Sequence, residues 1–334
     1  MSIFVSVIIP VRDAEAYLPS CLKQLREQNY PSELLEVIIV DGLSRDSTVE
    51  VGENYPMGRI TRKVIKCESM GRAQGLNTGI KAAKGDAICR LDSRTRIDAN
   101  YIRICVETLR TTGAANVGGL QVPDGDTVAE KAIGLAMSHP FGVGNAQFRI
   151  AKVSGYVDTV YLGFFRRDIF EKVGYFDEEA NVISEDSDLN QRIRAAGERI
   201  YLNTSLQARY QPRDSLREQF WLYFRYGGAR GGNVLKHGNF TSLRQLAAPA
   251  LIVMVFLLPF AAWWSQIALY LWFAVILSYS SADIVVSTML ARKNRQYSLI
   301  PYLLSAFPCM HFGFGLGFWR IMLIPERPNT PWKG

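Results

Sequence analysis

Apolar and polar residues alternate in blocks along the first hundred positions of the chain. Compact apolar runs occupy residues 4–10 (FVSVIIP) and 34–40 (LLEVIIV), and a third strand-like run occupies residues 86–92 (DAICRLD). Between the first two runs, residues 14–28 carry apolar side chains at helical spacing. Because the runs are apolar at successive positions, they predict strands that are buried on both faces. Strands that alternate with helices predict an α/β fold, with a mostly parallel sheet between two layers of helices.

Polar residues follow each of the predicted strands. In open parallel sheets, ligands bind beyond the carboxyl ends of the strands. An acid in such a place is often only a turn former or a helix cap, but three strand ends of this kind predict a nucleotide pocket. The residues at these ends are Pro10, Arg12, Asp13, Asp41, Asp92 and Arg94.

A glycine-rich helix start, GRAQGLNTGIKAAKGD, follows at residues 71–86. A plain surface helix is one interpretation of this stretch. Arg72, Gln74 and Asn77 at its opening would also suit contacts to a phosphate or a base, because backbone donors and the helix dipole favour an anion there.

Asp92 ends the third predicted strand, where a carboxylate is costly to bury without a positive partner. Arg94 and Arg96 follow at once, and a metal ion is the other candidate partner. The residues alone leave three arrangements open: an ion pair with an arginine, a metal site, or both.

Charge nearly disappears after about residue 244. Residues 246–264 carry no charge, residues 266–290 carry only Asp283, and residues 299–323 carry only His311 and Arg320. Each segment approaches or exceeds the ~20 residues that a membrane-spanning helix needs. The pattern therefore predicts three membrane segments, with a buried core helix as the alternative for the first.

The third apolar segment is interrupted by residues that weaken helices. Pro308 and three glycines, Gly313, Gly315 and Gly317, leave a broken or re-entrant helix open as an interpretation. Basic residues precede the first segment and follow the second, so the positive-inside rule predicts a cytoplasmic N-terminal domain. Arg327 and Lys333, beyond the third segment, conflict with that rule.

The stretch before the membrane segments, RDSLREQFWLYFRYGGARGG, combines apolar residues at helical spacing with arginines. It predicts an amphipathic helix on the membrane surface, and a packed core helix is the alternative. Its basic and tyrosine side chains are candidates for contacts to the diphosphate of a donor or of a lipid carrier: Arg225, Tyr226 and Arg230.

Composition narrows the function classes. The formal net charge of +7 could suggest nucleic acid, but no nucleic-acid-binding module is recognisable, and anionic lipid headgroups explain basic residues beside a membrane segment better. We therefore predict no nucleic-acid partner. No Gly-x-Gly-x-x-Gly follows the first strand, which argues against a dinucleotide oxidoreductase. The five cysteines lack metal-ligand spacing and indicate reduced thiols.

Several motifs together resemble the inverting glycosyltransferase family 2. They are VSVIIPVRD, VIIVDGLSRDST, GRAQGLNTGIKAAKGD, LDSRTR and ISEDSDLNQRIRAAG, in the order and approximate spacing of that family, over about residues 5–226. The resemblance implies a Rossmann-like GT-A fold that binds a nucleotide-sugar. The middle section (SHPFGVGNAQFRI and VDTVYLGFFRRDIFEKVGYFDE) and the short membrane tail resemble bacterial members of the succinoglycan type, which build exopolysaccharide repeat units on a lipid carrier.

The resemblance also implies a divalent metal, Mg²⁺ or Mn²⁺. Asp92 matches the first acid of the family's Asp-x-Asp motif, but Arg94 stands at the second. An arginine cannot ligate a metal because it stays protonated, although it could clamp a phosphate. We therefore expect a metal held by Asp92 and the diphosphate, with Arg94 as a second cation. A metal-free ion pair between Asp92 and Arg94 is the alternative.

The remaining site residues follow from the same resemblance. Asp41 matches the family acid that meets the ribose or the base, and Arg12-Asp13 stands where the family has Asn-Glu. The expected nucleotide-sugar contacts are Pro10, Arg12, Asp13, Asp41, Arg72, Asn77, Asp92 and Arg94. Asp186 matches the general base. Its neighbours Glu185 and Asp188 could raise its basicity by repulsion or compensate the helix dipole.

These observations predict a membrane-anchored inverting hexosyltransferase with three regions: a catalytic GT-A domain at 1–212, an interfacial segment at 213–245 and a membrane domain at 246–334. We expect it to move one hexose, most simply glucose, from a UDP-sugar to a polyprenyl-diphosphate-linked saccharide at the cytoplasmic face of the inner membrane. A processive polysaccharide synthase is one alternative, although Gln-x-x-Arg-Trp is absent near QARYQPR. A non-catalytic membrane scaffold is the other.

Overall fold

The computed structural model of the protein describes residues 2–68, 71–178, 185–238 and 243–324. These residues form two compact units. The first contains residues 2–122, 147–178 and 185–210, and the second contains residues 123–146, 211–238 and 243–324. Residues 123–146 fall inside the predicted catalytic range 1–212, but they pack with the C-terminal helices.

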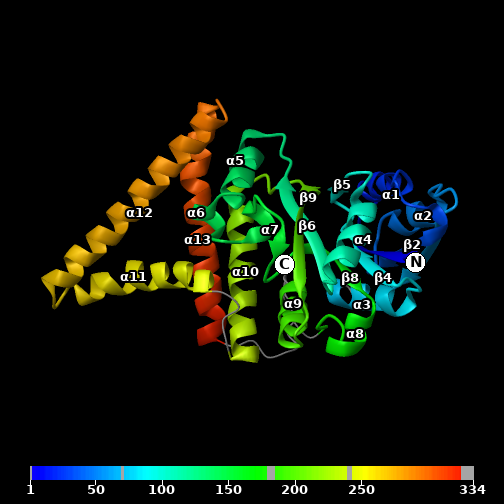
Figure 1. The fold of residues 1–334 in the computed structure, drawn as a ribbon. Helices are drawn as coiled ribbons and strands as arrows, with labels where there is room; N and C mark the ends of the chain where they lie inside the picture. The colour runs from blue at the N-terminus through cyan, green and yellow to red at the C-terminus, as the bar shows by residue number, and fades with distance from the viewer. Residues whose placement is uncertain (1, 69–70, 179–184, 239–242, 325–334) are drawn as a thin grey trace. The chain divides into compact units, whose positions relative to one another are not determined.

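One mixed sheet organises the first unit (Figure 1). Along the sheet the order is β3 (Thr61–Lys66), β2 (Leu35–Asp41), β1 (Val5–Val11), β4 (Ala87–Arg90), β8 (Tyr161–Arg166), β6 (Asn116–Pro123), β9 (Ile200–Tyr210) and β5 (Arg96–Ile97), and β7 (Gly155–Tyr156) also pairs with β9. The strands from β3 to β4 are parallel. Beyond β4, the pairings of β8 with β4 and with β6, and of β5 and β7 with β9, are antiparallel.

Alternate side chains of the parallel strands enter two different hydrophobic cores. Val5, Val7 and Ile9 pack with α1 (Leu18–Arg26) and α4 (Tyr101–Thr112) on one face. Ile8 and Ile38 enter the second core, together with α3 (Arg72–Ala82), α8 (Asp168–Val173) and α9 (Glu185–Ala195). Each fully buried Val or Ile contributes about 1.5–3 kcal/mol relative to exposure. The prediction of an α/β sheet buried on both faces is therefore confirmed. The short elements of the unit are η1 (Ser32–Leu34), α2 (Thr48–Asn54) and α7 (Gln147–Ile150).

Strand register places the polar strand ends at one edge of the sheet. Val11 of β1 pairs with Asp41 of β2, and Ile8 of β1 pairs with Arg90 of β4. Both pairings are parallel, so the chain leaves these three strands on the same side. The loops that carry Asp13, Asp41 and Asp92 therefore meet at this edge.

Helices make up the second unit. They are α5 (Val128–Met137), α6 (Pro140–Val143), α10 (Leu216–His237), η2 (Leu243–Leu246), α11 (Ala247–Ala261), α12 (Gln266–Lys293), η3 (Tyr297–Leu299) and α13 (Ile300–Leu323). A capping box at Thr127 and Glu130 begins α5, which is worth about 1 kcal/mol at such a helix start. Helix α13 packs against α5, α10, α11 and α12.

Helix α13 is continuous through Pro308 and its glycines, so the broken third segment considered from the sequence is not what forms. The glycines instead allow close helix packing. A Cβ atom on Gly317 would lie 1.9 Å from the carbonyl oxygen of Phe224 in α10, and one on Gly227 would lie 1.9 Å from that of Phe314. Such contacts between backbones are open only to glycine.

Two of the described helical stretches, Gln266–Lys293 and Tyr297–Leu323, are long and apolar enough to cross a membrane. Helix α11 has 15 residues. At 1.5 Å per residue it spans about 22 Å, less than the ~30 Å of a hydrocarbon core. The first predicted segment, 246–264, therefore forms a shorter helix than a straight crossing requires. Arg327 and Lys333, which conflicted with the positive-inside rule, lie outside the described residues.

Candidate active site

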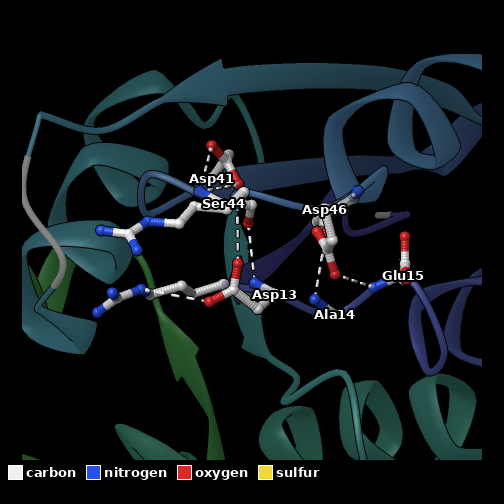
Figure 2. A network of polar contacts seen from close by, with 9 residues as sticks. Asp13, Ala14, Glu15, Asp41, Ser44 and Asp46 are labelled. Carbon is white, nitrogen blue, oxygen red and sulfur yellow. Dashed lines mark hydrogen bonds and ion pairs between the residues drawn. The ribbon is translucent and has the colours of Figure 1, made fainter.

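Two loops at the edge of the sheet where β1 and β2 end are braced against each other. Figure 2 shows Asp13, from the loop after β1, beside Ser44, from the loop after β2. Asp13 has a φ of 46°, in the left-handed region that Asp and Asn tolerate best after Gly. Its N–H donates to Oγ of Ser44 at 2.9 Å, and its Oδ1 accepts from the N–H of Arg45 at 2.8 Å. Asp13 thus joins the two loops.

A second pair of carboxylates completes the brace. The N–H of Glu15 donates to Asp46 at 3.1 Å (Figure 2). The N–H of Ser47 donates to Glu15 at 2.9 Å. The Thr48 hydroxyl donates to Asp46 and lowers the pKa of that carboxyl below its ordinary value. Asp46 therefore stays ionised at neutral pH, and the hydrogen bonds of both carboxylates fix the loop geometry.

Asp41 differs from these acids. It is buried, and among the described residues its carboxylate accepts only from the N–H of Ser44, at 3.3 and 3.4 Å. Such long bonds leave acceptor capacity on both oxygens. Among the acids of these two loops, Asp41 is therefore the best placed to accept hydrogen bonds from ribose hydroxyls.

The positive partner of Asp92 is Arg90. Nε of Arg90 lies 3.3 Å from Oδ1 of Asp92. Arg94, in contrast, stacks its guanidinium on the ring of Tyr17 at 4.3 Å, so the ion pair between Asp92 and Arg94, which the sequence left as an alternative, does not form. Two residues apart on extended backbone, Arg90 and Asp92 share a face. A charge inside a run that is buried on both faces was the signal in the sequence for this pair.

Arg90 also pairs with the start of α9. Its Nη2 lies 2.9 Å from Oε1 of Glu185, and Arg72 of α3 lies 3.7 Å from the same oxygen. Burial opposes the charge on Asp92, but Arg90 and Arg72 outweigh it and lower the pKa of Asp92 below its ordinary value. The cluster therefore brings carboxylates from two different elements next to buried arginine charge.

The three acids of α9 have different surroundings. Asp188 is buried and forms an ion pair with Arg192 at 2.9 Å, one helical turn later. Glu185 faces Arg90. Asp186 contributes to the negative field that raises the pKa of Arg90, although burial opposes this. The sequence-based assignment of Asp188 to helix stabilisation is consistent with this geometry, and Asp186 as the base stays a prediction.

Asn77 has a structural task. Its Nδ2 donates to the carbonyl of Phe176 at 2.8 Å and to Glu178 at 2.7 Å, and its Oδ1 accepts from the N–H of Phe176 at 3.0 Å. The side chain is buried and its hydrogen-bonding groups are engaged. We therefore do not retain Asn77 as a nucleotide contact.

The other predicted contacts divide between the units. Pro10 is half-buried at the end of β1, and Arg12 is exposed near Asp13. The three residues predicted to meet a diphosphate lie on α10 of the second unit and are half-buried: Arg225, Tyr226 and Arg230.

Comparison with known proteins identifies the family. The family model described as glycosyl transferase family 2 matches residues 6–174, just over half of the chain. The chain belongs to glycosyltransferase family 2. The family and the enzyme class inferred from the motifs are thereby confirmed.

Two curated relatives align with nearly the whole of this family 2 chain. Succinoglycan biosynthesis protein ExoA of Rhizobium meliloti (strain 1021) is 28% identical over 95% of this chain and 94% of its own length. The second, from Methanococcus voltae, is named dolichyl N-acetyl-alpha-D-glucosaminyl phosphate 3-beta-D-2,3-diacetamido-2,3-dideoxy-beta-D-glucuronosyltransferase. It is 24% identical over 94% of this chain and 97% of its own.

Solved structures support the fold assignment. The mannosyltransferase PcManGT of Pyrobaculum calidifontis, solved with GDP-Man and Mn²⁺, superimposes with a TM-score of 0.64 at 16% identity, over 98% of this chain and 89% of its own. TarS of S. aureus gives 0.51 at 17% identity, over 96% and 55%. The GT-A fold predicted for this family 2 chain is therefore confirmed.

Proposed function

We propose that this protein transfers a single hexose, most simply glucose, from a UDP-sugar to a polyprenyl-diphosphate-linked saccharide during exopolysaccharide synthesis. The reaction takes place at the cytoplasmic face of the inner membrane. One observation supports this proposal most strongly. The same chain combines the family 2 fold with a long apolar helix, α12, whose side chains mostly face outward. The relatives support the substrates, because one is named for succinoglycan biosynthesis and the other for a dolichyl-linked sugar phosphate.

In this proposal, the nucleotide binds at the edge of the sheet where β1, β2 and β4 end. Asp41 accepts from the ribose hydroxyls, and the braced loop of Pro10, Arg12 and Asp13 lies along the base. The brace keeps these loops in one conformation before the donor arrives, so less conformational entropy is lost on binding. Arg72, half-exposed at the start of α3, is available to the phosphates.

The residues at the end of β4 fit a divalent cation bound with the donor. Oδ2 of Asp92 makes no hydrogen bond or ion pair with the residues that the structure describes. Within that part of the chain no group of three His, Cys, Asp or Glu side chains could enclose a metal. Asp92 would therefore hold Mg²⁺ or Mn²⁺ together with phosphate and water oxygens, an arrangement usual for Mg²⁺. When bound, the cation stabilises charge on the departing diphosphate.

Asp186 takes the proton in the transfer step. The acceptor hydroxyl oxygen forms a bond to the anomeric carbon while the bond from that carbon to the diphosphate oxygen breaks. The electron pair leaves with the diphosphate, and the hydroxyl proton moves to the carboxylate of Asp186. Attack opposite the leaving group inverts the anomeric centre.

A donor-by-acceptor assay tests this function. Membranes containing the full chain are incubated with labelled UDP-glucose and polyprenyl-diphosphate-linked sugars, and the lipid products are separated by size. We expect each acceptor to gain one sugar. A ladder of products would identify a processive synthase, and no transfer with any donor would favour a membrane scaffold.

A further inference from the structure

Arg90 is a buried cation to which the chemistry above gives no task. Only 5% of its surface is exposed. It lies in β4, yet it pairs with Asp92 at 3.3 Å and with Glu185 of α9 at 2.9 Å. Asp92 is the proposed metal ligand, and Glu185 precedes the proposed base, Asp186. One guanidinium thus contacts both halves of the reaction centre.

We propose that Arg90 is a positioning residue for catalysis. By binding Asp92 and Glu185 at once, it fixes the first turn of α9 against the end of β4. Asp186 is then held at a constant distance from a donor bound at Asp92. The inference rests on the assignment of Asp186 as base in the proposed function.

The chemistry of arginine suits this task. Its planar fork presents separate N–H groups to two carboxylates, whereas a lysine ammonium is a single point.

The test compares kcat at saturating donor for Arg90→Met, Glu185→Gln and the double variant. A misplacement near 1 Å can cost about 100-fold in rate, so we expect Arg90→Met to lower kcat by about that factor. The kcat of the double variant should fall no further than that of Arg90→Met alone, because both substitutions remove the same ion pair between Arg90 and Glu185. If the two reductions in kcat multiply in the double variant, or if Arg90→Met has a normal kcat, the inference is overturned.

Arg90→Lys keeps the test decisive if Arg90→Met does not fold. It retains the charge but cannot contact both carboxylates in the same way, so kcat should fall about 10-fold with little change in donor affinity. A wild-type kcat for Arg90→Lys would contradict the proposal. Arg166→Met is the matched control, because Arg166 pairs with Asp168 and Glu198 elsewhere in the first unit. Failure of the proposed function itself would appear in the wild-type protein, as absence of transfer.

A separate observation concerns the membrane helices. Most exposed large apolar side chains lie on α11, on α12 and on the turn between them, where Trp263 and Trp264 are 86% and 83% exposed. Along α13, the exposed side chains of this kind are Tyr302 and Leu323, near its two ends. The surface that lipid would have to cover is therefore on the α11–α12 hairpin.

Helix α13 is instead packed against a charged helix. Gly313 approaches Phe220 and Gly317 approaches Phe224, so α10 and α13 run in parallel side by side (Figure 1). The charged residues of α10 are Arg217, Glu218, Arg225, Arg230 and Lys236. An arginine at the centre of a bilayer costs about 2.5–3.5 kcal/mol on insertion scales. A helix with this composition does not cross, and a helix packed in parallel along it shares its orientation.

We infer that the α11–α12 hairpin alone enters the bilayer, and that α10 and α13 lie together along its surface. The uncharged turn residues that follow α11 at 262–264, Trp263 and Trp264 among them, then cover the depth that the short α11 leaves and lie at the opposite interface, where tryptophan is favoured. Both ends of the membrane region face the same side. This inference rests on the membrane association in the proposed function.

Reporter fusions and labelling test this topology in the full chain. A fluorescent protein fused to the C-terminus should fluoresce, and alkaline phosphatase fused there should be inactive, because the C-terminus stays in the cytoplasm. Ser265→Cys, in the hairpin turn, should react with an impermeant maleimide from outside, with the wild-type protein as control for the native cysteines. Active phosphatase or an unlabelled Ser265→Cys would overturn the inference. If the chain is missing from the membrane fraction, the proposed membrane association fails instead.

Discussion

Two glycines of α10 allow the close packing with α13 to be tested directly. A Cβ on Gly227 would lie 1.9 Å from the carbonyl oxygen of Phe314, whereas one on Gly232 would have nothing within 4 Å. Both glycines are in the same helix, and neither has a positive φ. Gly227→Ala and Gly232→Ala are therefore matched substitutions with opposite expected effects.

The magnitude follows from the geometry. An ordinary contact between carbon and a carbonyl oxygen is about 3.3 Å or longer. Gly227→Ala therefore forces the two backbones to move away from each other by roughly 1.4 Å more. Overpacking of this kind costs about 1–3 kcal/mol of unfolding free energy. Replacing Gly by Ala in a helix also gains up to ~1 kcal/mol from helix propensity. Gly227→Ala combines this cost with this gain, whereas Gly232→Ala has the gain alone. Because the propensity gain is common to both variants, we expect them to differ by the overpacking cost, about 1–3 kcal/mol in unfolding free energy, in favour of Gly232→Ala.

Thermal unfolding in detergent, followed by tryptophan fluorescence, measures the difference. At about 2–4 °C per kcal/mol, a difference of about 1–3 kcal/mol means that Gly227→Ala should melt roughly 2–12 °C below Gly232→Ala. Equal Tm values, or a Gly227→Ala protein more stable than wild type, would show that α10 and α13 do not approach at their glycines. The parallel pairing that keeps α13 out of the bilayer would then be refuted as well.

Three further predictions concern individual side chains. Asp92→Ala should abolish Mn²⁺-dependent binding of UDP-sugar in calorimetry; wild-type binding that is insensitive to chelator would exclude the metal. Arg94→Ala should weaken donor affinity only about threefold, because Arg94 stacks on Tyr17 and such contacts are worth about 0.5–1 kcal/mol when exposed; a hundredfold loss would restore it as a phosphate clamp. Lys172 and then Arg166 hold the pKa of Glu198 below its ordinary value, so their contribution is complete above that value and is lost as the pH falls through the lowered pKa. Lys172→Met should therefore lower Tm at neutral pH and approach wild type once the pH falls below the lowered pKa of Glu198, and a deficit that stays constant with pH would contradict this.

The parallel half of the sheet was predictable because its side chains are apolar at successive positions. The strand ends were predictable too, because parallel register brings Asp41 and Asp92 to one edge. The pairing of Arg90 with Asp92 could have been predicted in the same way. A charge in a strand that is buried on both faces requires a partner, and Asp92 follows on the same face.

Other features depend on contacts far apart in the chain. The partner of Asn77 is Phe176, 99 positions away, so the sequence could not separate a structural amide from a nucleotide contact. The grouping of residues 123–146 with the C-terminal helices also depends on contacts between residues that are far apart in the sequence. The glycines of α13 were read as helix breakers because their role depends on the glycines of α10, which meet them only in the folded chain.

The most direct test of the central claim is the transfer rate of Asp186→Asn and Asp188→Asn, measured beside their affinities for the nucleotide-sugar. Loss of a general base costs about 10²–10⁴ in rate, and Asp186→Asn should show this in kcat while donor affinity stays near wild type. Asp188→Asn should lose less, because Asp188 pairs with Arg192 and acts on the helix. Near-normal transfer by Asp186→Asn, or a larger loss of kcat in Asp188→Asn, would contradict the mechanism.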